Sequence, residues 1–97
     1  MKEQIEILRV ATSSNPKSVA GAIIAILEQA GKLALLAVGA GAVNQTVKAI
    51  AIARSYMRTR NINISAEITF ERAIIDETEK TAMKFVIIAS QLENIEE

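Results

Sequence analysis

The sequence predicts a two-layer α+β fold of the α/β class: a four-stranded mixed sheet with two helices on one face, in the order βαβαββ. Two segments with a helical period of apolar residues each follow an apolar segment that is typical of a strand. A run of strict alternation then precedes one more apolar segment, which predicts an antiparallel hairpin. The 97 residues suffice for one domain, and we expect it to span residues 1–97.

The first strand-then-helix unit lies in residues 3–30. Residues 3–11 carry β-branched side chains in partial alternation, which favours a strand. Asn15 is a good N-cap, and Pro16 suits the first position of a helix because its missing N–H would be unpaired there. The apolar period predicts a helix over residues 16–30, and Gly31 ends it.

The second unit begins with an apolar run at residues 33–38, which predicts a strand that is central in the sheet or covered on both faces. A long helix over residues 39–60 follows it. At 100° per residue, one face of this helix carries Val43, Val47, Ile50, Ala53 and Met57. Because a crossover between parallel strands is right-handed, both helices are predicted on the same face of the sheet.

The last two strands are predicted to form the hairpin. Residues 61–72 alternate strictly, and one side of the strand carries Ile62, Ile64, Ala66, Ile68 and Phe70. Residues 76–79 form a polar tip, and residues 82–90 form the last strand, with Met83, Phe85 and Ile87 on one face. We expect the acidic tail at residues 91–97 to fray.

The composition limits the possible chemistry. The chain has no Cys and no His, which removes thiol chemistry, imidazole bases and nearly all zinc sites, so we expect no enzyme, no metal site and no cofactor. Apolar runs such as residues 19–27 are far shorter than a membrane span. The start of the chain lacks the apolar segment of a signal peptide, so we expect a cytoplasmic protein.

Charge is unevenly distributed although the formal net charge is zero. Residues 17–60 hold six basic residues against one acidic residue, and residues 61–97 hold three basic against eight acidic. This asymmetry is typical of a basic face for anionic partners, and equally of subunits that attract each other.

Two strand-to-helix turns, residues 12–18 and 39–45, are predicted to meet at the carboxyl edge of the parallel strands. Each turn leads into a helix whose first N–H groups can bind an anion such as phosphate. The candidate phosphate-binding residues are Lys17, Lys48, Ser14, Asn15, Asn44 and Gln45. Ordinary capping is an alternative interpretation of the turns, and a small phosphorylated or anionic ligand is an alternative occupant.

The long helix has more apolar surface than one sheet can cover. Ile52 and Tyr56 would be exposed in a monomer, which favours a homodimer or a higher homo-oligomer, although single apolar residues on a surface are also common. Arg54 falls within the apolar stripe and is assigned to the same interface. We expect it to pair with Glu67 or Glu71, within or between subunits.

Three segments carry a family resemblance. SNPKSVAGAI (residues 14–23), AVGAGAVNQTVKAIAIAR (residues 37–54) and TAMKFVIIA (residues 81–89) resemble the stage V sporulation protein S family of bacteria. That family is similar in fold to Alba, the small dimeric chromatin proteins of archaea. The resemblance implies the same βαβαββ order, a role in sporulation or developmental regulation, and binding of nucleic acid.

The match to the binding surface of Alba is partial. Alba proteins bind nucleic acid through a basic loop before the first helix, the start of the second helix and a basic hairpin arm. Here the loop keeps only Lys17, and the second helix starts with Gly39 and Gly41, with Lys48 nearby. The hairpin tip is acidic, which repels phosphate.

We therefore predict a non-enzymatic, dimeric regulator that binds DNA or RNA weakly. The alternative is a protein-interaction or scaffold module that assembles through the second helix and the last strand without nucleic acid.

Overall fold

The fold is the predicted βαβαββ arrangement. A computed structural model describes residues 4–92 of the chain. Its elements are β1 (Ile7–Val10), α1 (Pro16–Ala30), β2 (Lys32–Ala37), α2 (Ala40–Arg58), β3 (Ile62–Ile75) and β4 (Thr78–Gln91). The strands form one sheet in the order β1-β2-β4-β3, in which β1 and β2 are parallel and β4 is antiparallel to both of its neighbours. The predicted mixed sheet of four strands is confirmed.

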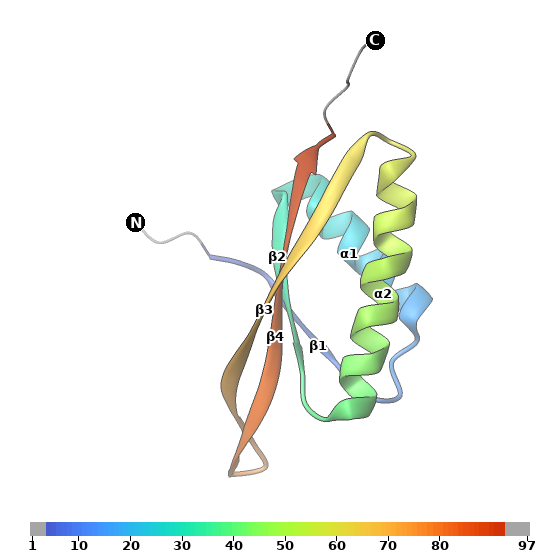
Figure 1. Cartoon of the computed structure of the whole chain (residues 1–97). Helices are drawn as coiled ribbons and strands as arrows, with labels where there is room; N and C mark the ends of the chain where they lie inside the picture. The colour runs from blue at the N-terminus through green and yellow to red at the C-terminus, as the bar shows by residue number, and fades with distance from the viewer. Residues whose placement is uncertain (1–3, 93–97) are drawn as a thin grey trace.

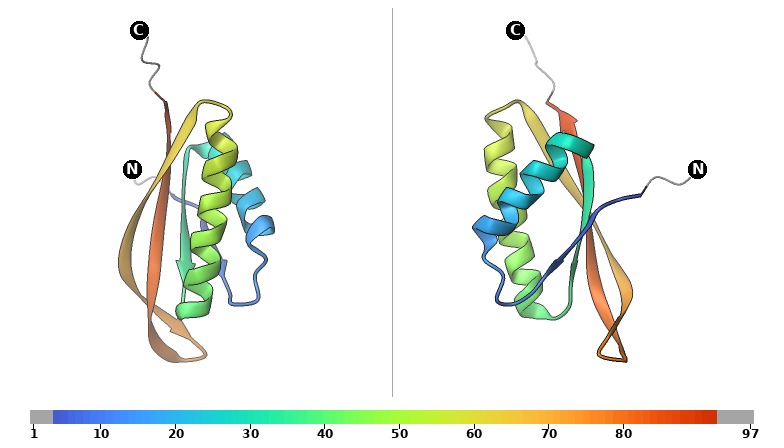
Figure 2. Two further views of the ribbon diagram at one scale, coloured as in Figure 1. Left: turned by 45° about the vertical axis from the view of Figure 1, so that its right-hand side comes forward. Right: turned by 180° about the vertical axis from the view of Figure 1, so that it is seen from behind.

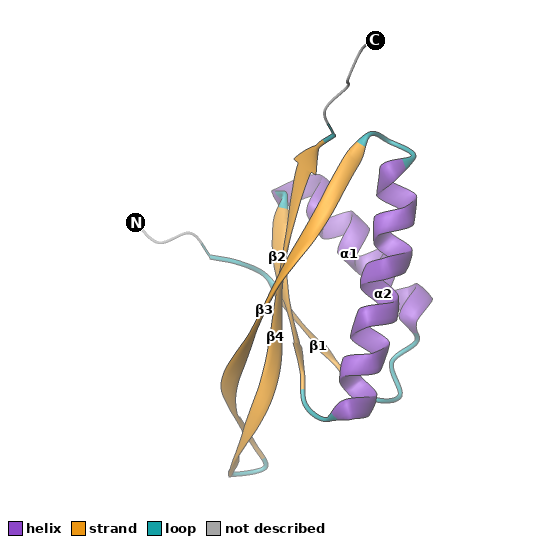
Figure 3. Ribbon diagram, viewed as in Figure 1, coloured by secondary structure: helices purple, strands orange, loops and turns teal. Residues whose placement is uncertain are grey.

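Both helices lie on one face of the sheet, as predicted (Figures 1 and 3). The space between the two layers is filled by aliphatic side chains and one phenylalanine. β2 and β4 contribute Leu33, Leu35, Phe85 and Ile87, and the helices contribute Ile23, Leu27, Ala49, Ala53 and Met57.

Helix α1 has the predicted bounds because both of its ends are set by local capping. The side chain of Asn15 accepts hydrogen bonds from the backbone N–H groups of Lys17 and Ser18, and Pro16 occupies the first turn. At the other end Gly31 adopts a left-handed conformation with φ of 77°, and its N–H donates to the carbonyl of Leu27.

The buried stripe of α2 differs from the predicted face. Of the predicted face, Ala53 and Met57 are buried and Val43 and Ile50 are partly buried against the core, but Val47 is exposed. The buried residues are Ala42, Thr46, Ala49, Ala53 and Met57. Small side chains allow the helix axis to approach its neighbours closely, so the helix turns its alanines inward and leaves the larger Val47 outside. The buried hydroxyl of Thr46 donates to the carbonyl of Ala42, so it is satisfied within the helix.

The bounds of β1, β3 and β4 also differ from the prediction. β1 runs from Ile7 to Val10, whereas the prediction was residues 3–11, of which residue 3 lies outside the described part of the chain. At its end, the N–H of Ala11 donates to Ser14 Oγ and the carbonyl of Ala11 accepts from the N–H of Ser14. This turn ends the strand at Val10. β3 and β4 are longer than predicted and pair in register from Ile62 to Ile75. Of the tail, Gln91 belongs to β4, and the prediction of fraying at residues 93–97 lies outside the described residues.

A two-residue turn joins β3 and β4. Asp76 and Glu77 both have positive φ, 50° and 63°, which is the conformation that right-handed sheet twist favours in a tight hairpin. The predicted tip at residues 76–79 was too long for this reason. The side chains of Met83, Phe85 and Ile87 share the helix-covered face, as predicted, because they pair with alternate residues of β2 that lie in the core.

Candidate functional site

The turn before α1 is held by its own polar groups. Ser14 Oγ accepts from the N–H of Ala11, and Asn15 Oδ1 accepts from two N–H groups of α1. These bonds place Lys17 in the first turn of the helix, which contains no acidic residue. A cation there adds to the positive end of the helix macrodipole, so the arrangement raises the local positive potential.

The turn before α2 is built from glycines. Gly39 has a φ of 92°, which other residues rarely adopt, and it caps the helix without a side-chain hydrogen bond. Gly41 lies directly against the first turn: a Cβ added there would be 2.7 Å from Thr12 Oγ1. Glycine at residue 41 therefore allows the two turns to touch. The first turn of α2 also has no acidic residue.

A hydrogen bond between the turns fixes their relative position. Gln45 Nε2 donates to the carbonyl of Ser14 at 2.9 Å, and this contact is partly buried. The turn before α1 thus packs on the start of α2 at the carboxyl end of the parallel strands, and the start of α1 lies beside the middle of α2, next to Lys48 and Ile52 (Figure 2).

The two candidate lysines line one hollow. A cavity of about 540 Å³ is lined by Asn15, Pro16, Lys17, Lys48, Ala51 and Ile52. Both lysines are exposed, and among residues 4–92 neither takes part in an ion pair. Two cations beside an open cavity and next to a helix N-terminus attract anions and present donors for phosphate oxygens.

The four polar candidates occupy different situations. Ser14, Asn15 and Gln45 are committed to the turns through the bonds described above, so in this structure they position the lysines. Asn44 is exposed on the first turns of α2 and makes no side-chain hydrogen bond within the described part of the chain. Direct contact of these four residues with phosphate stays a prediction.

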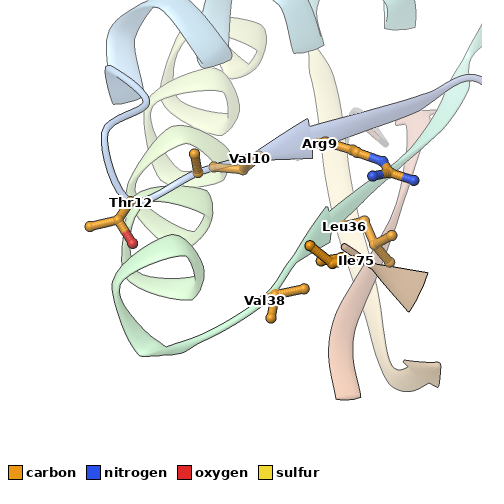
Figure 4. Close-up of a pocket in the computed structure, with 7 residues that line it drawn as sticks. Arg9, Val10, Thr12, Leu36, Val38 and Ile75 are labelled. Atoms are coloured by element: carbon orange, nitrogen blue, oxygen red, sulfur yellow. The ribbon is translucent and has the colours of Figure 1, made fainter. Parts of the chain in front are cut away.

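A second hollow lies on the opposite face of the sheet. It has a volume of about 290 Å³ and is lined by Arg9, Val10, Ala11, Thr12, Leu36, Val38 and Ile75. Figure 4 shows Arg9 from β1 and Ile75 from β3 on either side of Leu36 from β2. Within residues 4–92 the guanidinium of Arg9 has no ion pair. Sequence reasoning missed this cation. The sequence carries a signal for this position, because side chains alternate between the two faces of a strand. Leu8 and Val10 face the helices, so Arg9 between them faces away.

The predicted interface residues do not share one side of α2. Ile52 lines the lysine hollow and therefore faces α1, and Tyr56 lies one turn further along the same side, with the guanidinium of Arg60 5.3 Å from its ring centre. Arg60 also forms an ion pair with Glu28 of α1. Arg54 lies on the other side of the buried stripe.

The expected pairing of Arg54 within the chain is wrong. Within the described residues Arg54 pairs with neither Glu67 nor Glu71. Glu71 instead forms an ion pair with Lys84, with 3.9 Å between Glu71 Oε1 and Lys84 Nζ. Arg54 is exposed because the buried stripe of α2 is centred on its alanines. The intersubunit form of that pairing stays a prediction.

Within residues 4–92, no group of three or more acidic side chains is arranged to hold a metal ion. Neither of the two described helices has the length and apolar character to cross a membrane.

The comparison with known families agrees with the fold and with the motifs around both turns. The model of the family described as Stage V sporulation protein S matches residues 6–90 of the 97, a span that includes all of β1, α1, β2, α2 and β3. A match over this length indicates a role related to sporulation. The chain belongs to the Stage V sporulation protein S family.

Proposed function

We propose that this protein is a non-enzymatic, cytoplasmic regulator in sporulation that binds the phosphate backbone of nucleic acid at the lysine hollow, and that it acts as a dimer. The observation that carries the proposal is the convergence of Lys17 and Lys48 on one open cavity with no ion pair to neutralise either ammonium group within the described residues. Both ammonium groups are exposed, so they are accessible to an external anion.

The chemistry of the hollow fits a phosphate backbone better than a base edge. The residues around it offer ammonium groups and amides, and no aromatic ring lines it to stack on a base. Binding through two lysines is weak and depends on salt, because each neutralised phosphate releases condensed counterions. The protein is therefore expected to bind with little sequence preference and to prefer low ionic strength.

The test is a fluorescence anisotropy titration of labelled duplex and single-stranded probes with the full chain in low salt. Lys17→Ala/Lys48→Ala is expected to reduce affinity for either probe at least about tenfold, since two phosphate contacts are lost. The matched control is Arg72→Ala/Lys80→Ala, which removes two positive charges from the hairpin and is expected to change affinity little or raise it. Equal loss in both variants would mean that net charge, and not the hollow, controls binding.

A second candidate function is a protein-interaction or scaffold module that works without nucleic acid. It is favoured by the exposure of Ile52 and Tyr56, 39% and 45%, on neighbouring turns of α2. Sedimentation velocity of Ile52→Asp/Tyr56→Asp tests it. A smaller assembly than that of the unmodified chain supports the module, and an unchanged assembly rejects this interface.

A further inference from the structure

Strand β1 is an edge strand whose outer side is open. It lies at the end of the sheet order β1-β2-β4-β3, so among the described strands it pairs with β2 alone. In a parallel ladder the main-chain groups of alternate residues point to the same side. The N–H of Ala34 donates to the carbonyl of Glu6, so Leu8, two residues further along, also directs its main-chain groups at β2. Ile7 and Arg9 therefore direct their N–H and C=O groups to the open side.

The turn after β1 satisfies the next outward pair of main-chain groups. Ala11 comes two residues after Arg9, and its N–H and carbonyl bond to Ser14 Oγ and to the N–H of Ser14, each at 2.9 Å. Ser14 thus takes the place that a neighbouring strand would fill beside Ala11. For Ile7 and Arg9, no described residue supplies such a bond. Unpaired main-chain groups along an edge are the template on which a further strand adds.

A groove on the helix side runs along the same edge. It has a volume of about 270 Å³, and we call it the edge groove. β1 and α1 line it together, with Leu8, Arg9, Val10, Ser18, Val19 and Ala22. The right-hand view of Figure 2 shows α1 beside β1. The side chains of Leu8, Val19 and Ala22 are half-buried, so the groove offers apolar surface to a side chain from outside.

The other face of the edge carries a cation. Side chains alternate along a strand, so Arg9 lies on the face away from the helices, in the hollow with Leu36 and Ile75 (Figure 4). Its guanidinium is exposed and forms no ion pair with any described residue. Among the described residues that line this hollow and the edge groove, Arg9 is the one charged side chain. A carboxylate is the complementary ligand, because its two oxygens match the two parallel donors of a guanidinium.

We propose that the open edge of β1 binds an extended peptide segment of another protein in which apolar and acidic residues alternate. The peptide pairs with the main-chain groups of Ile7 and Arg9 as an added strand. Paired residues of neighbouring strands lie on the same face, so the peptide residue opposite Arg9 is the acidic one. Its neighbours point to the helix face, where an apolar side chain enters the edge groove. The contact uses no residue of the hairpin and neither lysine of the hollow, so it is independent of nucleic-acid binding.

The combination of features selects a peptide over other anions. A small carboxylate would reach Arg9 but leave the outward main-chain groups unpaired. A phosphate backbone has no N–H group to donate to the carbonyls of Ile7 and Arg9. β1 has four residues, so at about 3.3 Å per residue the contact extends over roughly 13 Å and takes about four or five peptide residues.

The first test is an anisotropy titration of a short fluorescein-labelled peptide, in which valine and glutamate alternate, with the full chain. Arg9→Glu is expected to weaken binding about tenfold or more, because the carboxylates then face a like charge. Arg58→Glu makes the same change at an exposed arginine of α2 and should keep the affinity of the unmodified chain. A peptide with lysine in place of glutamate should reverse the preference. No binding to the unmodified chain, or equal affinity in the two variants, overturns the proposal.

The main-chain part of the contact is tested by amide hydrogen exchange, measured by NMR. The N–H groups of Ile7 and Arg9 should exchange more slowly in the complex, whereas those of Leu8 and Val10 bond to β2 with or without the peptide. N-methylation of the peptide backbone removes its donors and should abolish binding. If the amides of Ile7 and Arg9 exchange equally fast in the complex, the peptide is not an added strand and the proposal is wrong.

The edge groove is tested by Ser18→Trp, which places a large ring in it. Ser18 is exposed, so thermal unfolding should change little, while affinity for the peptide falls about tenfold because the ring excludes the apolar side chain. Unchanged affinity would show that the peptide does not enter the groove. An assembly of the chain alone that Ser18→Trp disrupts would place a second copy at this edge and would also overturn the proposal.

Discussion

Replacement of Gly41 by alanine tests whether the two turns touch as the structure describes. The added Cβ would be 2.7 Å from Thr12 Oγ1, 2.8 Å from Cγ2 and 3.2 Å from Cβ. Non-bonded carbon contacts are favourable at about 3.5–4.0 Å, so the turn before α1 or the start of α2 must shift. Such overpacking costs about 1–3 kcal/mol, and alanine returns about 0.5–1 kcal/mol of helix propensity. The expected net loss of unfolding free energy is roughly 0–2.5 kcal/mol, centred near about 1 kcal/mol.

Gly21→Ala is the matched control. Gly21 is exposed within α1, and an added Cβ would have no atom within 4 Å, so only the gain in helix propensity of about 0.5–1 kcal/mol applies. Thermal unfolding followed by circular dichroism distinguishes the variants, since 1 kcal/mol shifts the midpoint by about 4–8 °C in a domain of this size. The two midpoints are expected to move in opposite directions.

The double variant Thr12→Ala/Gly41→Ala shows where the strain arises. It is expected to recover most of the loss seen in Gly41→Ala, which a double-mutant cycle measures as a coupling free energy. If Gly41→Ala raises the unfolding midpoint as Gly21→Ala does, the start of α2 does not press on Thr12 and the geometry of the hollow is wrong.

Three other predictions follow from single residues. Lys17→Glu places an anion in the first turn of α1 and is expected to raise the urea-unfolding free energy by about 0.3–1 kcal/mol while it lowers affinity for a duplex probe in the anisotropy assay. A variant that loses both unfolding free energy and duplex affinity would contradict the account. Glu77→Gly relieves the positive φ of 63° in the hairpin turn and is expected to stabilise the fold by about 1 kcal/mol in thermal unfolding, whereas a lower midpoint would refute the turn geometry. Glu28→Gln breaks the exposed ion pair with Arg60 and is expected to change urea stability by less than about 0.5 kcal/mol, so a loss above about 1.5 kcal/mol would assign that pair a larger structural role.

The parts of the fold with local signals were predictable from the sequence. Asn15, Pro16 and Gly31 act within a few residues of themselves, so the bounds of α1 follow from them. The order of strands and helices follows in the same way from apolar periods. The neighbouring positions of the two turns followed from the parallel pairing of β1 and β2, which places both strand ends at one edge of the sheet.

The parts that depend on packing were not predictable. The buried face of α2 depends on how closely the helix approaches the sheet. A close approach leaves room only for small side chains, so Ala49 is buried and Val47 is exposed. Alternation in β3 showed which side chains share a face, but it gave no sign that neither helix extends far enough to cover Phe70. The hairpin turn lacks glycine, so Asp76 and Glu77 carried no tight-turn signal.

The salt dependence of nucleic-acid binding tests the central claim most directly. The slope of the logarithm of the association constant against the logarithm of salt concentration counts neutralised phosphates. Measured by anisotropy on one duplex probe, the slope of Lys17→Ala/Lys48→Ala is expected to be smaller in magnitude than that of the unmodified chain by about 2, one for each lysine. Equal slopes for the two proteins would show that these lysines do not contact phosphate.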